Sequence, residues 1–169
     1  GLQKVRNEVA ALNRYTIEFF QDVGGDNFPF QRIEGAQINK GSVGTYTNVV
    51  VNDLVCFMGS GFNEAISFYI GLNGQITKIA TSEIEQKLSK YTETQLASSI
   101  MEYKIYNGHV HIMTHLPDKT LVYDISASQE LGLPIWYTMD SGLLEASTYR
   151  AKNHIFCYNR WNVADSTTT

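Results

Sequence analysis

Residues 101–115 read MEYKIYNGHVHIMTH. A run rich in β-branched and aromatic residues stands on each side of Asn107-Gly108, at 101–106 and at 109–115. An Asn-Gly pair favours a type I′ turn, because both central residues of that turn have positive φ. The stretch therefore predicts a tight antiparallel hairpin.

The same pattern extends outward from this hairpin. Two more pairs of runs flank turn residues: 47–51 with 54–58 around Asn52-Asp53, and 66–70 with 75–79 around residues 71–74. Further strands are expected at 15–20, 120–124, 135–138, 147–150 and 154–158. These short, turn-bounded runs predict a mainly β, antiparallel fold.

One segment, 82–99, departs from the strand pattern and predicts two short helices. Ser82 with Glu85, and Thr92 with Gln95, have the spacing of a capping box. Three apolar side chains fall on one helix face: Ile84, Leu88 and Tyr91. We expect this insertion to cover a sheet edge or link two sheets, with a docking element for a partner as the alternative.

An internal repeat is indicated by four asparagines in similar contexts: Asn13, Asn52, Asn107 and Asn153. They stand 39, 55 and 46 residues apart, and the longest interval contains the helical insertion. Without it that interval is roughly 40 residues, the length of a four-stranded propeller blade. We predict one β-rich domain over 1–169, or a fragment of a longer chain, made of blade-like sheets of a β-propeller. The expected blades are 9–35, 43–80, 100–140 and 145–162, and a β-sandwich is the alternative.

Composition excludes several classes of protein. The 169 residues are 43% hydrophobic and 18% charged, and no run of 18 apolar residues occurs, so we expect neither a disordered chain nor a membrane protein. The net charge of −4 lacks the basic excess of proteins that grip DNA phosphates, so no tight or sequence-specific nucleic-acid binding is expected. The chain starts at Gly1 without Met, and we expect both ends to be cut from a longer chain.

Histidine and cysteine patterns were the candidates for reactive or metal sites. His109 and His111 share one strand face, with His115 further along it, a loose spacing for a metal site. The alternative interpretation is a pair of exposed strand histidines. Cys56 and Cys157 lie in apolar runs without a CxxC motif and are expected to be buried, reduced thiols. His154 and Cys157, three residues apart on a strand, would point to opposite faces and form no dyad.

Carboxylates and aromatics supply the other candidates. Ten acidic residues are candidates for a glycosidase-like pair, and most are expected to cap turns instead: Glu18, Asp22, Asp26, Glu34, Asp53, Glu64, Glu102, Asp118, Asp124 and Asp140. Tyr46, Tyr91 and Trp161 are candidate interface anchors, although core packing is the usual role of aromatics in a β fold. We predict no catalytic, cofactor-binding or metal-binding residue and no enzyme. The alternatives are a β-fold glycan hydrolase or a sugar- or metal-binding module.

Several collinear segments resemble the packaged-DNA stabilisation proteins, or tail accessory factors, of short-tailed, tailspike-bearing phages of enteric bacteria. These segments run from residue 16 to about residue 142: TIEFF at 16–20, QINKGSVGTY at 37–46, IATSEIE at 79–85, SKYT at 89–92 and HLPDKTLVYD at 115–124. They are structural blocks and contain no catalytic signature.

The resemblance implies a structural protein of the virion tail, assembled in the bacterial host cytoplasm. It implies propeller-like β domains, attachment below the portal and its adaptor as a homo-oligomer, a hexamer, and docking of the tail needle and tailspikes. It also implies a role in retaining packaged DNA, without cofactors or a membrane.

Overall fold

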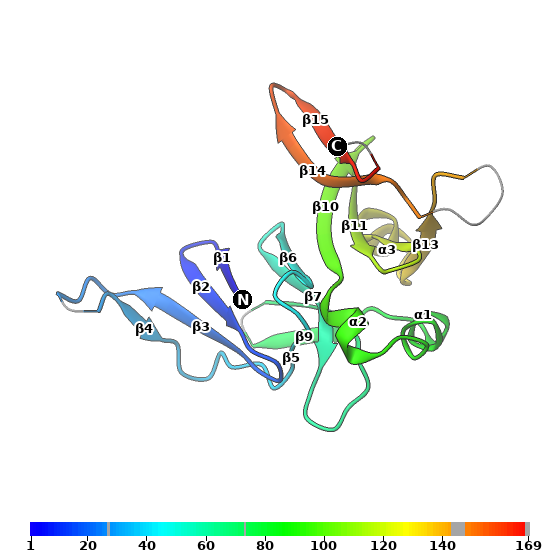
Figure 1. The fold of residues 1–169 in the computed structure, drawn as a ribbon. Helices are drawn as coiled ribbons and strands as arrows, with labels where there is room; N and C mark the ends of the chain where they lie inside the picture. The colour runs from blue at the N-terminus through cyan, green and yellow to red at the C-terminus, as the bar shows by residue number, and fades with distance from the viewer. Residues whose placement is uncertain (27, 73, 143–147, 168–169) are drawn as a thin grey trace. The chain divides into compact units, whose positions relative to one another are not determined.

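The structure is a computed structural model that describes residues 1–26, 28–72, 74–142 and 148–167 (Figure 1). Antiparallel strands make up most of its regular structure, so the mainly β prediction is confirmed. The chain divides into two compact units, Gly1–Ser98 and Ser99–Thr169.

The first sheet of unit 1 is a four-stranded meander. Its strands pair in chain order: β1 (Leu2–Val5), β2 (Glu8–Leu12), β3 (Ile17–Asp22) and β4 (Phe30–Arg32). Because side chains alternate between the faces of a strand, Ile17 and Phe19 of β3 point into the core while Glu18 and Phe20 point away. Strands β1, β2 and β4 were not among the predicted strands.

The second sheet of unit 1 is built around β7. Its strands are β5 (Gly41–Ser42), β6 (Asn48–Val51), β7 (Leu54–Ser60), β8 (Ser67–Leu72) and β9 (Gln75–Lys78). β6 pairs with the first half of β7 and β5 with its end, and β8 and β9 follow on the other side. The predicted turn is confirmed, since Asn52 and Asp53 have φ of 48° and 63°. Apolar residues of both sheets form one core: Val5, Ala10, Leu12, Ile17, Phe19, Ile38, Val55, Phe57 and Tyr69.

The predicted helical insertion consists of α1 (Ser82–Leu88) and α2 (Glu93–Ala97). The capping box of Thr92 and Gln95 is confirmed. The predicted cap at Ser82 is wrong by one residue, because Thr81 has the extended backbone of an N-cap and its side chain accepts from the Ile84 N–H.

Unit 2 contains the predicted Asn107-Gly108 hairpin. β10 (Ile100–Tyr106) and β11 (His109–His115) pair around Asn107-Gly108, with β12 (Thr120–Asp124) and β13 (Ile135–Met139) completing a four-stranded sheet. Helix α3 (Ile125–Leu131) was missed. Its signals are Asp124 as N-cap and Gly132, which ends the helix with φ of 70°.

The last two strands form a hairpin, β14 (Ala151–Cys157) with β15 (Arg160–Asp165). The strand predicted at 154–158 begins earlier than expected, at Ala151, and Asn153 lies inside β14 at a register shift, with φ of 56°. The turn falls at Tyr158-Asn159, where both φ values are positive. Of the predicted strand 147–150, residue 147 lies outside the described residues, and Thr148 forms only an isolated bridge to Asp140.

Candidate functional site

Unit 2 contains two carboxylates, each of which contacts two histidine side chains. Asp124 at the end of β12 lies beside His109 and His111, and Glu102 on β10 contacts His115 and His154. These clusters are the main concentrations of buried polar groups in this unit, so their geometry decides whether they are reactive or structural.

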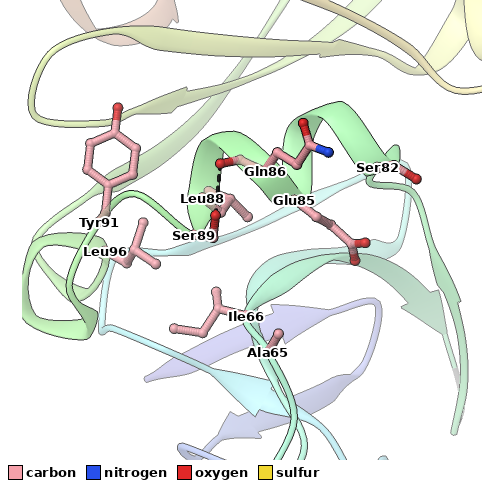
Figure 2. Close-up of a pocket in the computed structure, with 9 residues that line it drawn as sticks. All are labelled: Ala65, Ile66, Ser82, Glu85, Gln86, Leu88, Ser89, Tyr91 and Leu96. Atoms are coloured by element: carbon pink, nitrogen blue, oxygen red, sulfur yellow. Dashed lines mark hydrogen bonds between the residues drawn. The ribbon is translucent and has the colours of Figure 1, made fainter.

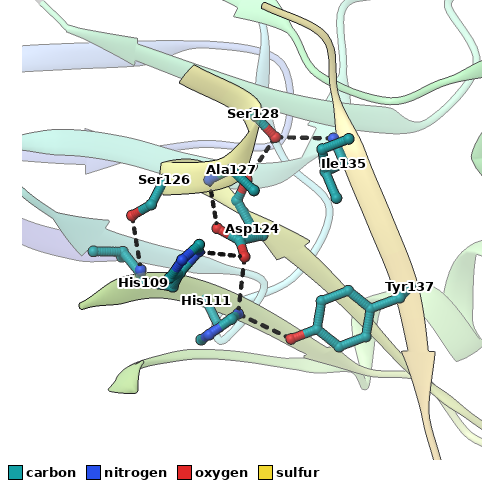
Figure 3. A network of polar contacts seen from close by, with 9 residues as sticks. His109, His111, Asp124, Ser126, Ala127, Ser128, Ile135 and Tyr137 are labelled. Atoms are coloured by element: carbon teal, nitrogen blue, oxygen red, sulfur yellow. Dashed lines mark hydrogen bonds and ion pairs between the residues drawn. The ribbon is translucent and has the colours of Figure 1, made fainter. Parts of the chain in front are cut away.

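Asp124 connects a sheet to a helix (Figure 3). Its Oδ1 accepts from the Ala127 N–H at 2.8 Å, which caps α3, and its Oδ2 lies 2.9 Å from His109 Nδ1. The Tyr137 hydroxyl lies 2.9 Å from His111 Nδ1, whereas Oδ2 of Asp124 is 3.8 Å from that same nitrogen. A proton relay through an imidazole uses both ring nitrogens, so this arrangement is not an Asp–His–Tyr relay.

Two serines of α3 extend the network to the neighbouring strands (Figure 3). Ser126 Oγ accepts from the Val110 N–H of β11 at 3.0 Å. Ser128 Oγ donates to the Asp124 carbonyl at 2.5 Å and accepts from the Ile135 N–H of β13 at 2.9 Å. The helix is thus held to three strands. Burial lowers the pKa of His111 and outweighs the opposing effect of Asp124, so the neutral imidazole is favoured as an acceptor for Tyr137.

Glu102 accepts three hydrogen bonds. Its Oε1 lies 2.6 Å from His115 Nε2 and 2.8 Å from His154 Nδ1, and its Oε2 accepts from the His154 backbone N–H at 2.8 Å. Burial raises the pKa of this carboxyl, but the hydrogen bonds from His115 and His154 outweigh burial and bring it to about 2. Glu102 is therefore ionised at neutral pH and fastens β14 to β10 and β11.

Aromatic rings surround this cluster. The ring of Tyr149 is nearly parallel to those of His115 and His154, at 3° and 9°. Trp161 of β15 packs edge-on against Phe156 and Tyr103, with centroids 5.5 and 6.1 Å apart. This packing and Glu102 together hold the β14–β15 hairpin against β10.

The structure divides the predicted histidine candidates between the two clusters. His109 and His111 do share a face, with ring centroids 6.0 Å apart, but the expectation that both are exposed is wrong because His111 is buried. His115 belongs to the other cluster. Within the described ranges, no three or more His, Cys, Asp or Glu side chains are placed to hold a metal ion. Sequence reasoning missed the pairing of Glu102 with His154, which lie 52 residues apart and share no local motif.

Most of the other predicted acidic candidates form an ion pair or a hydrogen bond. Four form ion pairs: Glu18 with Arg32, Asp53 with Arg6, Glu64 with Lys40 and Asp118 with Lys119. The turn-capping interpretation is right for Asp22, whose Oδ1 accepts from the Gly24 N–H. Asp124 instead caps a helix that was not predicted. Asp26, Glu34 and Asp140 are exposed.

Both cysteines are free, as predicted. Cys56 is buried in β7, and burial raises the pKa of its thiol. Cys157 is partly exposed rather than buried, and its Sγ lies 3.1 Å from Asn162 Nδ2.

Unit 1 contains a groove of about 490 Å³ beside the two helices (Figure 2). Its apolar lining comes from Ala65, Ile66, Leu88, Tyr91 and Leu96, and its polar lining from Ser82, Glu85, Gln86 and Ser89. Of the predicted interface aromatics, Tyr91 lines this groove and Tyr46 is 69% exposed, whereas Trp161 is packed within unit 2.

Comparison with known proteins assigns the fold to a family. Residues 1–169 match the family model described as bacteriophage P22 Gp10, β-propeller. The chain belongs to this family. It is also 29% identical over 168 residues to the tail hub protein gp10 of Salmonella phage P22, an alignment that covers 98% of this chain and 35% of that protein. The chain thus spans about a third of the length of this relative.

The family resemblance inferred from the sequence is therefore confirmed, and the matching model is that of a β-propeller. Across the described residues, the helices lack the length and hydropathy that crossing a membrane requires.

Proposed function

We propose that the chain is a β-propeller segment of a phage tail hub, a structural protein of the virion that acts through protein–protein contacts and has no catalytic role. The observation that carries the proposal is the match of the whole chain to the P22 Gp10 family, together with its likeness to a tail hub protein.

The architecture supports this role. Each of the three sheets of four or five strands serves as one blade, and β14–β15 supplies two strands of a fourth. These blades overlap the intervals predicted from the sequence, 9–35, 43–80, 100–140 and 145–162. The buried carboxylates of unit 2 are occupied in holding strands and a helix together, which is the use of polar groups expected in a scaffold.

The proposed partners follow the family resemblance. The hub assembles as a hexamer below the portal and its adaptor, receives the tail needle and tailspikes, and helps retain the packaged genome. The net charge of −4 suits a DNA conduit, since repulsion of phosphates opposes adhesion of DNA to its wall. The hub is assembled in the host cytoplasm and resides in the virion tail.

Reconstitution tests the proposal. The full-length protein that carries these residues is added to DNA-filled heads bearing portal and adaptor, and DNA leakage is measured. We expect binding and retention of DNA. A variant with Phe57→Asp, a charge in the core of unit 1, should lose both, whereas the exposed Thr77→Asp should not. Leakage unchanged by the wild-type protein would refute the proposal.

A further inference from the structure

The β3–β4 hairpin extends beyond the sheet to which it belongs. Strand β2 pairs with β3 only as far as Glu8 opposite Gln21, and beyond this point β3 pairs with β4 alone, Asp22 opposite Phe30. Figure 1 shows this end of the hairpin lying away from β1 and β2. We call residues 22–26 and 28–30 the arm tip.

The arm tip exposes large apolar side chains. Val23 is 50% exposed, Phe28 68% and Phe30 37%. The two phenyl rings pack edge to face, with centroids 6.1 Å apart, so they form one aromatic surface. Clustered exposed aromatics are typical of protein interfaces.

The arm tip also has a defined conformation. The Val23 N–H donates to the Pro29 carbonyl at 2.7 Å, and the Gly24 N–H donates to Asp22 Oδ1 at 2.9 Å. At Gly25, a Cβ would lie 2.7 Å from the Phe28 carbonyl oxygen, so the tight approach requires glycine. A surface that is ordered before binding loses less entropy when a partner binds.

The arm tip also carries two carboxylates, Asp22 and Asp26, and among the described residues neither forms an ion pair. Asp22 bonds only the backbone of the tip, and Asp26 is exposed. Arg32, the cation on β4, is paired with Glu18 at 3.1 Å. The tip therefore carries two exposed phenyl rings together with two carboxylates that form no ion pair among the described residues, and an apolar depression rimmed by Lys and Arg would complement this combination.

We propose that the arm tip is a docking element that inserts into an apolar, basic-rimmed depression on another protein of the phage tail. A neighbouring blade that packs on either face of this sheet would cover the part where all four strands pair. The arm tip would stay uncovered, because it lies past the end of β2. The inference rests on the proposed function and adds the surface and the chemistry of its partner.

Binding assays on the full-length protein test the aromatic part. Affinities for the portal–adaptor complex, the tail needle and the tailspike are measured separately, for wild type and for Phe28→Ser with Phe30→Ser. We expect roughly tenfold or greater loss for one of the three partners. Phe62→Ser, which alters an aromatic 74% exposed elsewhere in unit 1, should bind as wild type does.

Several outcomes would overturn the proposal. The proposal fails if the double variant binds every partner with wild-type affinity. It also fails if the double variant loses self-association instead, because the arm tip would then bind a second copy of this chain. A lowered melting temperature of the free double variant would show that the tip is covered by its own chain. Wild type that binds none of the three partners would instead refute the proposed function itself.

The charges have a separate test. Asp22→Asn keeps the acceptor for the Gly24 N–H and removes the charge, and it is combined with Asp26→Asn. Binding of this variant to the same partner should be several-fold weaker at low salt and less sensitive to added salt. Glu34→Gln, an exposed carboxylate outside the tip, is the matched control. Unchanged salt dependence would contradict the basic-rimmed partner.

Discussion

At the scale of single residues, Glu102 and Thr114 are two polar side chains of unit 2 that differ in their hydrogen bonding. The two oxygens of Glu102 accept three hydrogen bonds from two histidines. The hydroxyl of Thr114 is buried and, in the described part of the chain, without a hydrogen-bond partner. The first group is retained as an anion between strands, while the second costs stability.

Replacing Glu102 with Gln should change how stability depends on pH. The pKa of Glu102 is about 2 in the folded chain against an ordinary value of 4.5. A lowered folded-state pKa gives stability that is present above the ordinary value and is lost as pH falls toward the folded one. The wild-type free energy of unfolding, measured by denaturant titration, should therefore fall between about pH 4.5 and 2 more steeply than that of Glu102→Gln.

At pH 7 the Glu102→Gln variant should be less stable by about 2 kcal/mol, as expected for hydrogen bonds to a charged group. Glu130→Gln, an exposed carboxylate on α3, serves as the control and should retain the wild-type pH dependence. Parallel pH profiles for wild type and Glu102→Gln would show that Glu102 is not held as an anion.

Thr114→Val should stabilise the chain by up to about 1 kcal/mol, because it replaces an unsatisfied hydroxyl by a methyl group of similar size. Thr120→Val on the next strand is the matched change: its hydroxyl lies 2.9 Å from His115 Nδ1, and its loss should cost about 1 kcal/mol. Chemical denaturation of the two variants measures both signs. Equal destabilisation by both would mean that the Thr114 hydroxyl has a partner.

At the scale of secondary structure elements, turn chemistry agrees with the fold at most hairpins. Asn52-Asp53 and Asn107-Gly108 adopt positive φ, for which these residue types are favoured. The β14–β15 turn breaks this rule, since Tyr158 has φ of 52° and its side chain is 91% exposed. A bulky residue in that region is strained, and so exposed a tyrosine buries little surface that could compensate.

Tyr158→Asn should therefore stabilise unit 2, by up to about 1 kcal/mol, because asparagine tolerates the left-handed region better than tyrosine. Thermal or denaturant unfolding measures the change. Tyr137→Asn is the contrasting variant, since Tyr137 contacts His111 and should be needed for stability. A Tyr158→Asn variant less stable than wild type would show that the ring makes a stabilising contact.

At the scale of the whole molecule, the two cysteines report on the two units separately. Cys56 lies in the core of unit 1, where burial raises the pKa of its thiol, and Cys157 is partly exposed in unit 2. Thiolates are the reactive form, so a buried thiol with a raised pKa reacts slowly.

A maleimide reagent should label Cys157 in the native chain and Cys56 only after unfolding. Mass spectrometry of labelled protein should thus find one label in buffer and two in denaturant. With Cys157→Ser, the rate of labelling at Cys56 should follow the opening of unit 1. Rapid labelling of Cys56 in buffer would contradict its burial.

The sequence by itself determined the local structure. Alternating runs, Asn-Gly and Asn-Asp turns and the Thr92 cap depend on neighbours close in the chain, so the hairpins of β6–β7, β8–β9 and β10–β11 and the helices α1 and α2 were predicted. The short strand β5 was missed because its local signal is weak and its pairing partner decides it. Helix α3 was missed although Asp124 and Gly132 mark its ends, because its seven residues directly follow a strand.

Only the tertiary structure decided the polar clusters and the arm tip. Glu102 meets His154 because β14 returns to β10 across 52 residues, and no spacing in the sequence encodes that approach. The exposure of Phe28 and Phe30 likewise depends on β2 ending opposite Gln21. The sequence pattern of an aromatic run is the same whether its side chains are buried or exposed. Secondary-structure propensity depends on neighbours along the chain, whereas burial and charge pairing depend on groups that are close in space. Only folding brings such groups, distant in sequence, within a few ångströms of one another.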